Sequence, residues 1–167
     1  MNKKIPAFII NYSNSDFTNP HELVLLDEPQ DCRSDYTHMG VKYTGLETCR
    51  HQHTRINPEG KFLEYNHNRC HWVEIGLKER ATIETIIVST KFFTGNQVQA
   101  ISVTLVDEIL GAEKCVLQRV KLNPDSDHSF KITPTIVTEC VVELFYEGGI
   151  SRIHFLGERE EIQFPKS

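Results

Sequence analysis

The sequence predicts an all-β fold, an antiparallel β-sandwich or jelly roll. Apolar and polar side chains alternate with a period of two in almost every periodic segment, including residues 72–77 and 101–106. This alternation is typical of strands that bury one face. Turn signals such as Asn57-Pro58-Glu59-Gly60 and Gly148-Gly149 separate these short segments. A helical period over three turns is found in no segment, which favours the all-β class.

The expected strands follow one another from the N-terminus. The first is IPAFII, residues 5–10, which comes directly after Lys3 and Lys4. A secretory signal needs an apolar run of about 7–15 residues and a small-residue cleavage site, so we interpret this shorter run as a strand. The further strands are expected at residues 72–77, 81–89, 100–106, 139–146 and 150–156. Since no low-complexity linker divides the chain, residues 1–167 are predicted to form a single domain.

Composition and charge exclude several classes of protein. The net charge is −5, with acidic and basic residues interspersed and no basic block, which argues against nucleic acid as a partner. No apolar run approaches the roughly 18–20 residues that span a bilayer, so no membrane association is expected. The five cysteines have irregular spacing, which does not indicate a disulfide framework. We therefore expect reduced thiols and a cytoplasmic location, with export by a route that needs no signal peptide left open.

Residues 28–71 differ from the rest of the chain because they are polar, rich in His and Asp, and poor in alternation. A segment of this length inside a compact domain is usually functional or a wrapped loop. Functional groups of sandwiches sit on loops that the strands hold in place. We therefore expect any site to lie here and at the ends of the strands.

A cluster of cysteine and histidine lies within this segment, in Cys49–His53 and His67–His71. Zinc binds thiolate and imidazole ligands in tetrahedral geometry, so a divalent metal, Zn or Mn, is the one cofactor that the sequence brings into consideration. The spacing matches no standard zinc pattern, and the alternative is that these histidines are solvated loop residues. The candidate metal ligands are His51, His53, His67 and His71.

A second set of polar side chains lies beside strand ends or glycine turns. Carboxylate and imidazole groups together can perform general acid–base catalysis, and arginine can bind a carboxylate through two hydrogen bonds. The alternative is that each is an ordinary surface residue. Trp72 faces away from the apolar stripe of its own strand, so it either covers a second apolar layer or lines a pocket. The set of polar side chains beside strand ends consists of Glu47, Arg50, Asn96, His128, Glu147 and Arg152.

Neither nucleophilic catalysis nor phosphate binding is indicated by any motif. The chain has no Gly-x-Ser-x-Gly sequence and no glycine-rich phosphate loop. Its one run of Ser126-Asp127-His128 is contiguous, which is the wrong geometry for a catalytic triad.

Four pieces of the chain, in order, resemble the allantoicase family. They are Gly45-Leu-Glu-Thr-Cys-Arg50, then His71-Trp72, then Ser89-Thr-Lys-Phe-Phe-Thr-Gly-Asn96, and then Tyr146-Glu-Gly-Gly-Ile-Ser-Arg152. The run Asp125-Ser-Asp-His-Ser-Phe130 is also similar to the family's segment before its last strands. The resemblance covers about residues 38–158, with order and spacing preserved.

The resemblance implies a jelly roll of the galactose-binding type and the hydrolysis of allantoate to ureidoglycolate and urea. It implies catalytic roles for Glu47, His128 and Glu147, by activation of water. It implies ligand binding by Arg50, Trp72, Asn96 and Arg152, with an arginine holding the substrate carboxylate. The matching positions are Glu47, Thr48, Arg50, Trp72, Thr90, Phe93, Gly95, Asn96, His128, Gly148, Gly149 and Arg152.

The chain also departs from the family's motifs, mainly where the family has charged or polar residues. Leu46 replaces a Trp, Cys49 an Arg, Phe92 a His and Thr94 a Lys, and Glu147 replaces an Asp. Loss of charged groups should reduce catalysis more than folding. We therefore expect a diverged domain that binds a small polar ligand, a glycan or a protein partner; the alternatives are an active allantoicase or a metal-dependent protein.

The resemblance also bears on assembly. Family members typically contain two such domains in one chain, whereas this chain has room for one. A homo-oligomer is therefore an expectation that follows from the resemblance.

Overall fold

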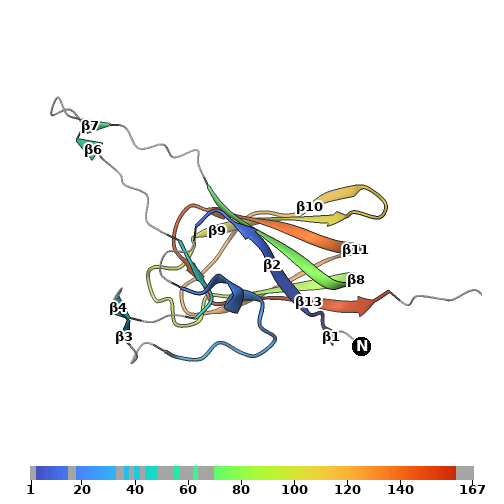
Figure 1. Ribbon diagram of the computed structural model, residues 1–167, viewed down its shortest axis with the longest axis horizontal. Helices are drawn as coiled ribbons and strands as arrows, with labels where there is room; N and C mark the ends of the chain where they lie inside the picture. The colour runs from blue at the N-terminus through green and yellow to red at the C-terminus, as the bar shows by residue number, and fades with distance from the viewer. Residues whose placement is uncertain are drawn as a thin grey trace, which may run out of the picture.

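The computed structural model describes residues 3–14, 18–32, 36–37, 40–41, 44–48, 55–56, 62–63 and 70–160 (Figure 1). Its elements, in chain order, are β1 (Lys3–Lys4), β2 (Ala7–Tyr12), the 3-10 helix η1 (Pro20–Val24), β3 (Tyr36–Thr37), β4 (Gly40–Val41), β5 (Leu46–Glu47), β6 (Arg55–Ile56), β7 (Phe62–Leu63), β8 (His71–Ser89), β9 (Ala100–Asp107), β10 (Ala112–Lys121), β11 (Asp127–Phe145), β12 (Gly149–Ile150) and β13 (Arg152–Arg159). The predicted all-β class is confirmed.

Two long strands organise the fold, since β8 and β11 each have 19 residues and pair with one another in antiparallel register along most of their length. The first half of β8 pairs with β2, and its second half pairs with β13. The second half of β11 pairs with β9, which in turn pairs with β10. Every pairing between these strands is antiparallel, and the sheet that they form follows the order β1-β13-β8-β11-β9-β10 with β2 joined to β8.

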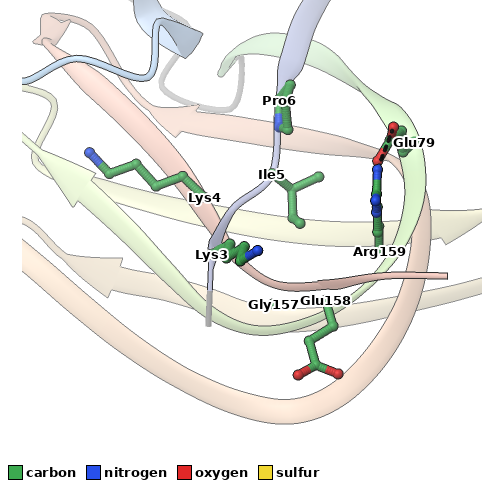
Figure 2. Close-up of a pocket in the computed structure, with 8 residues that line it drawn as sticks. All are labelled: Lys3, Lys4, Ile5, Pro6, Glu79, Gly157, Glu158 and Arg159. Carbon is green, nitrogen blue, oxygen red and sulfur yellow. Dashed lines mark ion pairs between the residues drawn. The ribbon is translucent and has the colours of Figure 1, made fainter. Parts of the chain in front are cut away.

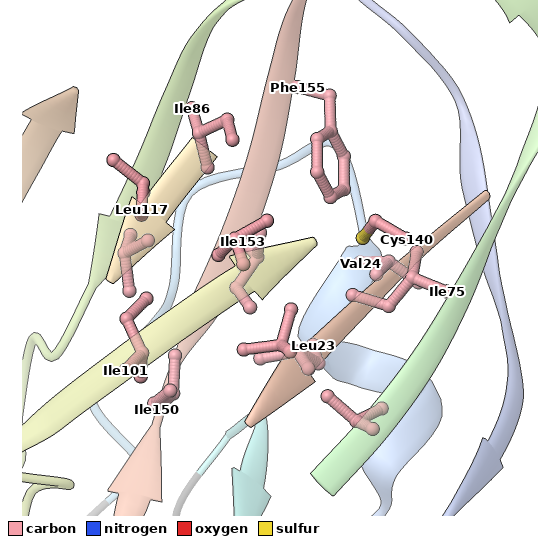
Figure 3. Packing of buried hydrophobic residues seen from close by; sticks show 14 of the residues in the cluster. Leu23, Val24, Ile75, Ile86, Ile101, Leu117, Cys140, Ile150, Ile153 and Phe155 are labelled. Atoms are coloured by element: carbon pink, nitrogen blue, oxygen red, sulfur yellow. The ribbon is translucent and has the colours of Figure 1, made fainter. Parts of the chain in front are cut away.

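The core lies against the inner faces of these strands (Figure 3). The predicted stripe of Val73, Ile75 and Leu77 is buried, at 0%, 0% and 8% exposure. Leu23 and Val24 of η1 reach the same cluster, and η1 begins where Asn19 caps it, by accepting a hydrogen bond from the backbone N–H of His21 at 3.2 Å. Burying a side chain of this size contributes about 1.5–3 kcal/mol, so η1 is fixed by its apolar side chains.

Several strand boundaries differ from the predicted ones. The two segments expected at 72–77 and 81–89 form the single strand β8, because the exposed Lys78 and Glu79 interrupt the alternation without ending the strand. The first expected strand, residues 5–10, begins only at Ala7 as β2, and Lys3–Lys4 before it form β1. Pro6 lies between the two strands, and proline lacks the N–H that would continue a ladder.

The loops at one end of the sheet lie together. The segment between β8 and β9 and the segment between β11 and β13 meet in a parallel bridge between Gln97 and Gly149. The short strand β5 pairs with β12 in the second of these segments. Three stretches far apart in the chain are thereby placed side by side at the ends of the long strands. The described residues include no helix long and apolar enough to cross a membrane.

Candidate functional site

The candidate site is the group of segments that meet at these strand ends, residues 44–48, 89–98 and 146–152, which we call the strand-end cluster. Within it, Leu46 pairs with Ile150, and Glu47 pairs with Gly149. The backbone N–H of Thr48 donates to the carbonyl of Gly148 at 2.9 Å, and the N–H of Gly148 donates to the hydroxyl of Thr48 at 3.0 Å. This reciprocal pair fixes the glycine turn against β5.

The two glycines of this turn have steric reasons to be glycine. The N–H of Gly149 donates to the carbonyl of Asn96 at 2.9 Å, and its own carbonyl accepts from Val98 at 3.0 Å. A side chain at Gly149 would place its Cβ 2.1 Å from Cε1 of the fully buried Phe93. Gly148 has φ of +125°, a conformation that favours glycine. The motif therefore allows close approach of two backbones.

Glu47 and Asn96 form a polar contact inside the cluster. The Nδ2 atom of Asn96 donates to Oε2 of Glu47 at 3.0 Å. Glu47 is only 8% exposed, and its backbone N–H donates to the hydroxyl of Thr18 at 2.9 Å. Two residues that the sequence predicted for one site, 49 positions apart in the chain, are thus in direct contact.

Arg152 makes a different set of contacts. Its guanidinium is buried at 3% exposure and lies 3.1 Å from Oδ1 of Asp27, which is 57% exposed. Its Nη1 donates to the hydroxyl of Thr44 at 2.6 Å and to the carbonyl of Ser151 at 2.7 Å. The Thr44 hydroxyl in turn donates to Oε2 of Glu22 at 2.9 Å. Among the described residues, the guanidinium of Arg152 thus contacts Asp27, Thr44 and Ser151 and not the Glu47–Asn96 pair.

His128 is engaged through both of its ring nitrogens. Its Nε2 accepts from the backbone N–H of Asn123 at 2.8 Å, and its Nδ1 lies 3.0 Å from the carbonyl of Val88. With Nε2 accepting, the proton sits on Nδ1, which donates to that carbonyl. The ring also stacks on Phe130, with centroids 6.3 Å apart. In this state His128 holds the turn before β11.

Two further predicted residues lie near the cluster. Glu147 is half-buried in the segment between β11 and β12. Trp72 is half-buried on β8, opposite Glu143 of β11, and its neighbour Val73 points into the core. The backbone N–H of Trp72 donates to the hydroxyl of Ser13 at 2.9 Å. Trp72 therefore faces outward, as its position in the stripe predicted.

Three of the candidate metal ligands, His51, His53 and His67, lie outside the described residues, as does the candidate ligand-binding residue Arg50. His71 is described, and its Nδ1 lies 3.0 Å from the hydroxyl of Ser13. Burial, and then a hydrogen bond to Glu143, raise the pKa of the neighbouring Cys70 thiol, which disfavours the thiolate that metals bind. In the part of the chain that the structure describes, no three His, Cys, Asp or Glu side chains are placed to hold a metal ion.

Some residues of the site were not singled out by the sequence. Asp27 and Thr44 bind Arg152, although they lie 125 and 108 positions away in the chain. Gln97 contributes a bridge to Gly149, and Lys121 and Asn123 lie beside it around a surface hollow. No local signal marks these residues, because their partners are brought close only by the pairing of distant strands.

A surface hollow near the N-terminus is separate from the cluster (Figure 2). It has a volume of about 730 Å³ and lies where β1 meets β13. Arg159 and Glu79 face one another across its upper part, with Nη1 and Oε1 3.6 Å apart. None of the residues predicted for a site lines it.

Comparison with known proteins finds relatives both in sequence and in structure. Residues 1–160 match the family model described as the allantoicase repeat. A probable allantoicase of Streptomyces coelicolor is 33% identical over 91 residues, which are 54% of this chain and 24% of that protein. The chain thus spans about a quarter of the length of this curated relative.

Among solved structures, the allantoicase of Saccharomyces cerevisiae is 24% identical with a TM-score of 0.70, covering 93% of this chain and 43% of that one. The family 32 carbohydrate-binding module of NanJ from Clostridium perfringens, solved in complex with galactose, is 10% identical with a TM-score of 0.60. It covers 93% of this chain and 99% of that one. These likenesses show the fold, and they confirm a jelly roll of the galactose-binding type.

Proposed function

Because residues 1–160 match the allantoicase repeat, the chain belongs to the allantoicase family, and we propose that it acts as a diverged, non-catalytic member that binds a small polar ligand. The ligand is bound at the ends of the long strands, beside the strand-end cluster. The fold alone does not decide between binding and catalysis. The proposal rests on what the charged side chains of the cluster contact.

The observation that carries the proposal is the engagement of Arg152. A hydrolase of this family is expected to use an arginine to hold the substrate carboxylate, and such an arginine must offer free N–H groups. The guanidinium of Arg152 is 3% exposed and already donates to Asp27, Thr44 and Ser151. Recruiting it for a substrate would break its hydrogen bonds to the buried Thr44 and Ser151, and buried polar groups left without a partner are costly.

The imidazole that the resemblance assigns to water activation is also engaged. Both ring nitrogens of His128 are within hydrogen-bond distance of backbone groups, one at Asn123 and one at Val88. A general base must have a nitrogen free to take a proton from water. The carboxylate of Glu47 is bound to Asn96 and is nearly buried. These contacts favour a structural role for His128 and Glu47 over a catalytic one.

The experiment that tests this is a turnover assay with allantoate, which measures release of urea and ureidoglycolate with and without added Mn²⁺ or Zn²⁺. We expect no turnover under either condition. Turnover that Glu47→Gln abolishes and the exposed-site control Glu113→Gln leaves intact would refute the binding function in favour of hydrolysis. Turnover that requires the added metal would instead support the metal-dependent alternative.

Binding is tested in parallel by thermal denaturation against small polar compounds, including galactose. A ligand at about a hundred times its Kd stabilises the native state by about 2.7 kcal/mol. For a chain of this length, this corresponds to a rise in Tm of roughly 5–10 °C. If none of the tested compounds changes Tm and no turnover is found, the proposal of ligand binding is contradicted.

Three predictions from the sequence belong to this proposal. The chain works as a single allantoicase-like domain, is located in the cytoplasm and forms a homo-oligomer. Light scattering coupled to size-exclusion chromatography measures the oligomeric state directly, and a molar mass of about one chain at all concentrations would contradict the last of them.

A further inference from the structure

The hairpin between β9 and β10 carries two aliphatic side chains at its turn. Ile109 and Leu110 are 70% and 71% exposed, whereas the other exposed large hydrophobic residues in the described part of the chain are at most 45% exposed. Turns are usually built from Gly, Pro, Asn, Asp and Ser, and exposed apolar side chains that lie together mark interaction sites. We call residues 107–113 the hairpin tip, and it lies at the end of β9 away from the strand-end cluster.

Hydrogen bonds to Asp107 fix the base of the hairpin tip. The guanidinium of Arg80 donates to both carboxylate oxygens of Asp107, at 3.2 and 2.7 Å, and Asp107 is only 3% exposed. Its Oδ1 also accepts from the backbone N–H of Ile109 at 3.2 Å. The N–H of Glu108 donates to the hydroxyl of Thr138 on β11 at 3.0 Å. Because the backbone is already held, burial of the two aliphatic side chains against a partner loses little conformational entropy.

The hairpin tip and the hollow where β1 meets β13 differ in charge. The tip contains three carboxylates and no cation, and among the described residues only Asp107 of these three forms an ion pair. The hollow, which we call the N-terminal hollow, is lined by three cations and two carboxylates. Of its cations, Lys3 is exposed and has no carboxylate of the described chain within ion-pair distance. Opposite charges favour approach of the tip to this hollow.

The N-terminal hollow also offers apolar surface. Ile5 and Pro6 form part of its wall, and Figure 2 shows their segment on one side of the hollow and the Arg159–Glu79 ion pair on the other. The methylene stems of lysine and arginine can cover apolar groups while their charged ends stay in water. The volume of about 730 Å³ falls within the roughly 300–1,000 Å³ of pockets that hold small molecules, which leaves room for two aliphatic side chains.

The hairpin tip and the N-terminal hollow lie at the same end of the molecule (Figure 1). Arg80, which binds the tip, and Glu79, which lines the hollow, are consecutive residues of β8. Two complementary surfaces this close in one chain can be joined to those of a second copy by a two-fold rotation, and such an interface closes as a dimer. Contact between two tips would instead bring carboxylates together, which is unfavourable.

We propose that the chain forms a two-fold dimer in which the hairpin tip of each copy occupies the N-terminal hollow of the other. Ile109 and Leu110 supply the buried apolar contact, and Lys3 faces the carboxylates of the second copy's tip. The inference names the surface of the homo-oligomer predicted above, and it does not depend on ligand binding at the strand-end cluster.

Sedimentation velocity of the full chain over a range of concentrations measures dimerisation of wild type, Leu110→Ser and Lys3→Glu. Both residues are exposed, so both variants should fold, and the melting temperature of each checks this. Each weakened contact should cost about a factor of ten in association, and the dimer contains the contact twice. Each variant alone should therefore dimerise about a hundredfold more weakly than wild type. The matched control is Ile10→Ser on β2, because Ile10 is 45% exposed and does not line the hollow; it should dimerise as wild type does.

Mixing the two variants tests the pairing of tip with hollow. In a mixed dimer, one contact carries both changes and the other carries none, since the intact tip of the Lys3→Glu chain meets the intact hollow of the Leu110→Ser chain. The mixed dimer should therefore form about tenfold more tightly than the dimer of either variant alone. A dimer held by contact between two tips would not show this gain.

Each other result overturns the inference. A wild type that is monomeric at every concentration contradicts the dimer and the predicted homo-oligomer, while ligand binding is judged separately by its own measurement of Tm. A dimer that Leu110→Ser or Lys3→Glu does not weaken, or that Ile10→Ser weakens equally, has its interface elsewhere. A mixture that associates no more tightly than the separate variants shows that the tip does not occupy the hollow.

Discussion

Replacing Arg152 by methionine tests whether this residue stabilises the fold or contacts a ligand. The substitution removes the hydrogen bond to the carbonyl of Ser151, a fully buried residue, and leaves that acceptor unpaired, at a cost of about 1–3 kcal/mol. The lost bond to Thr44 adds about 1 kcal/mol. Asp27 is 57% exposed, so water hydrates its carboxylate once the arginine is removed. Loss of the ion pair itself therefore adds little to the loss of stability.

The sum is a loss of about 2–4 kcal/mol in the free energy of unfolding. In a chain of this length each kcal/mol lowers Tm by roughly 2–4 °C, so Arg152→Met should melt about 5–15 °C below wild type. Thermal denaturation followed by circular dichroism measures this directly. The matched control is Arg159→Met, since Arg159 is 71% exposed and lies 3.6 Å from Glu79; it should change stability by less than about 1 kcal/mol.

A Tm within about 2 °C of wild type for Arg152→Met would refute this reasoning. If that variant also lost binding of a ligand that stabilises wild type, Arg152 would be a ligand contact, as the resemblance implies. Arg152→Lys supplies a further check, because an ammonium cannot reproduce the planar guanidinium that reaches Asp27, Thr44 and Ser151 at once. It should recover only part of the lost stability.

Three more predictions concern pH and packing. Burial lowers the pKa of His154, which is 4% exposed and donates to the carbonyl of Leu25 at 2.8 Å; its contribution to stability is present above about pH 6.5 and is lost as pH falls through the lowered pKa. Thermal denaturation at pH 7 and pH 5 should therefore show a smaller loss of Tm in His154→Gln than in wild type. Burial, and then a hydrogen bond to Glu108, raise the pKa of Glu139, so its favourable contribution is lost as pH rises through the raised pKa. Glu139→Gln should raise Tm at pH 7, by no more than about 3 °C, and change it little at pH 4. Gly149→Ala should lower the stability by about 1–3 kcal/mol or more through overpacking against Phe93, whereas an added Cβ at Gly95 would meet no atom within 4 Å, so Gly95→Ala should be close to neutral in urea denaturation.

The sequence predicts the strands well where one face is buried and poorly where neither face is. The stripe of Val73, Ile75 and Leu77 is buried as its period indicated. By contrast, β10 begins with the exposed residues 112–115, so burial imposes no alternation there that could mark where the strand begins. Residues 127–131 of β11 are likewise exposed or half-buried, and pairing with β8 holds them in the sheet. Alternation in the sequence indicates which face of a strand is buried, and it does not indicate which strands pair with one another.

The sequence names candidate residues for the site but does not indicate which of them contact one another. The resemblance selected both Glu47 and Asn96, and the structure places their side chains 3.0 Å apart. It also selected Arg152, whose partner Asp27 lies 125 positions earlier and carries no motif. Which polar groups meet depends on strand order and register, and these are set by the whole chain.

The motif residues at the strand ends mainly form contacts with backbone groups. Thr90 and His128 bind backbone groups of the turn at Asn123, and Gly149 lets two segments approach within hydrogen-bond distance. If these residues form a frame, the chemistry of binding must come from side chains that vary without disturbing it.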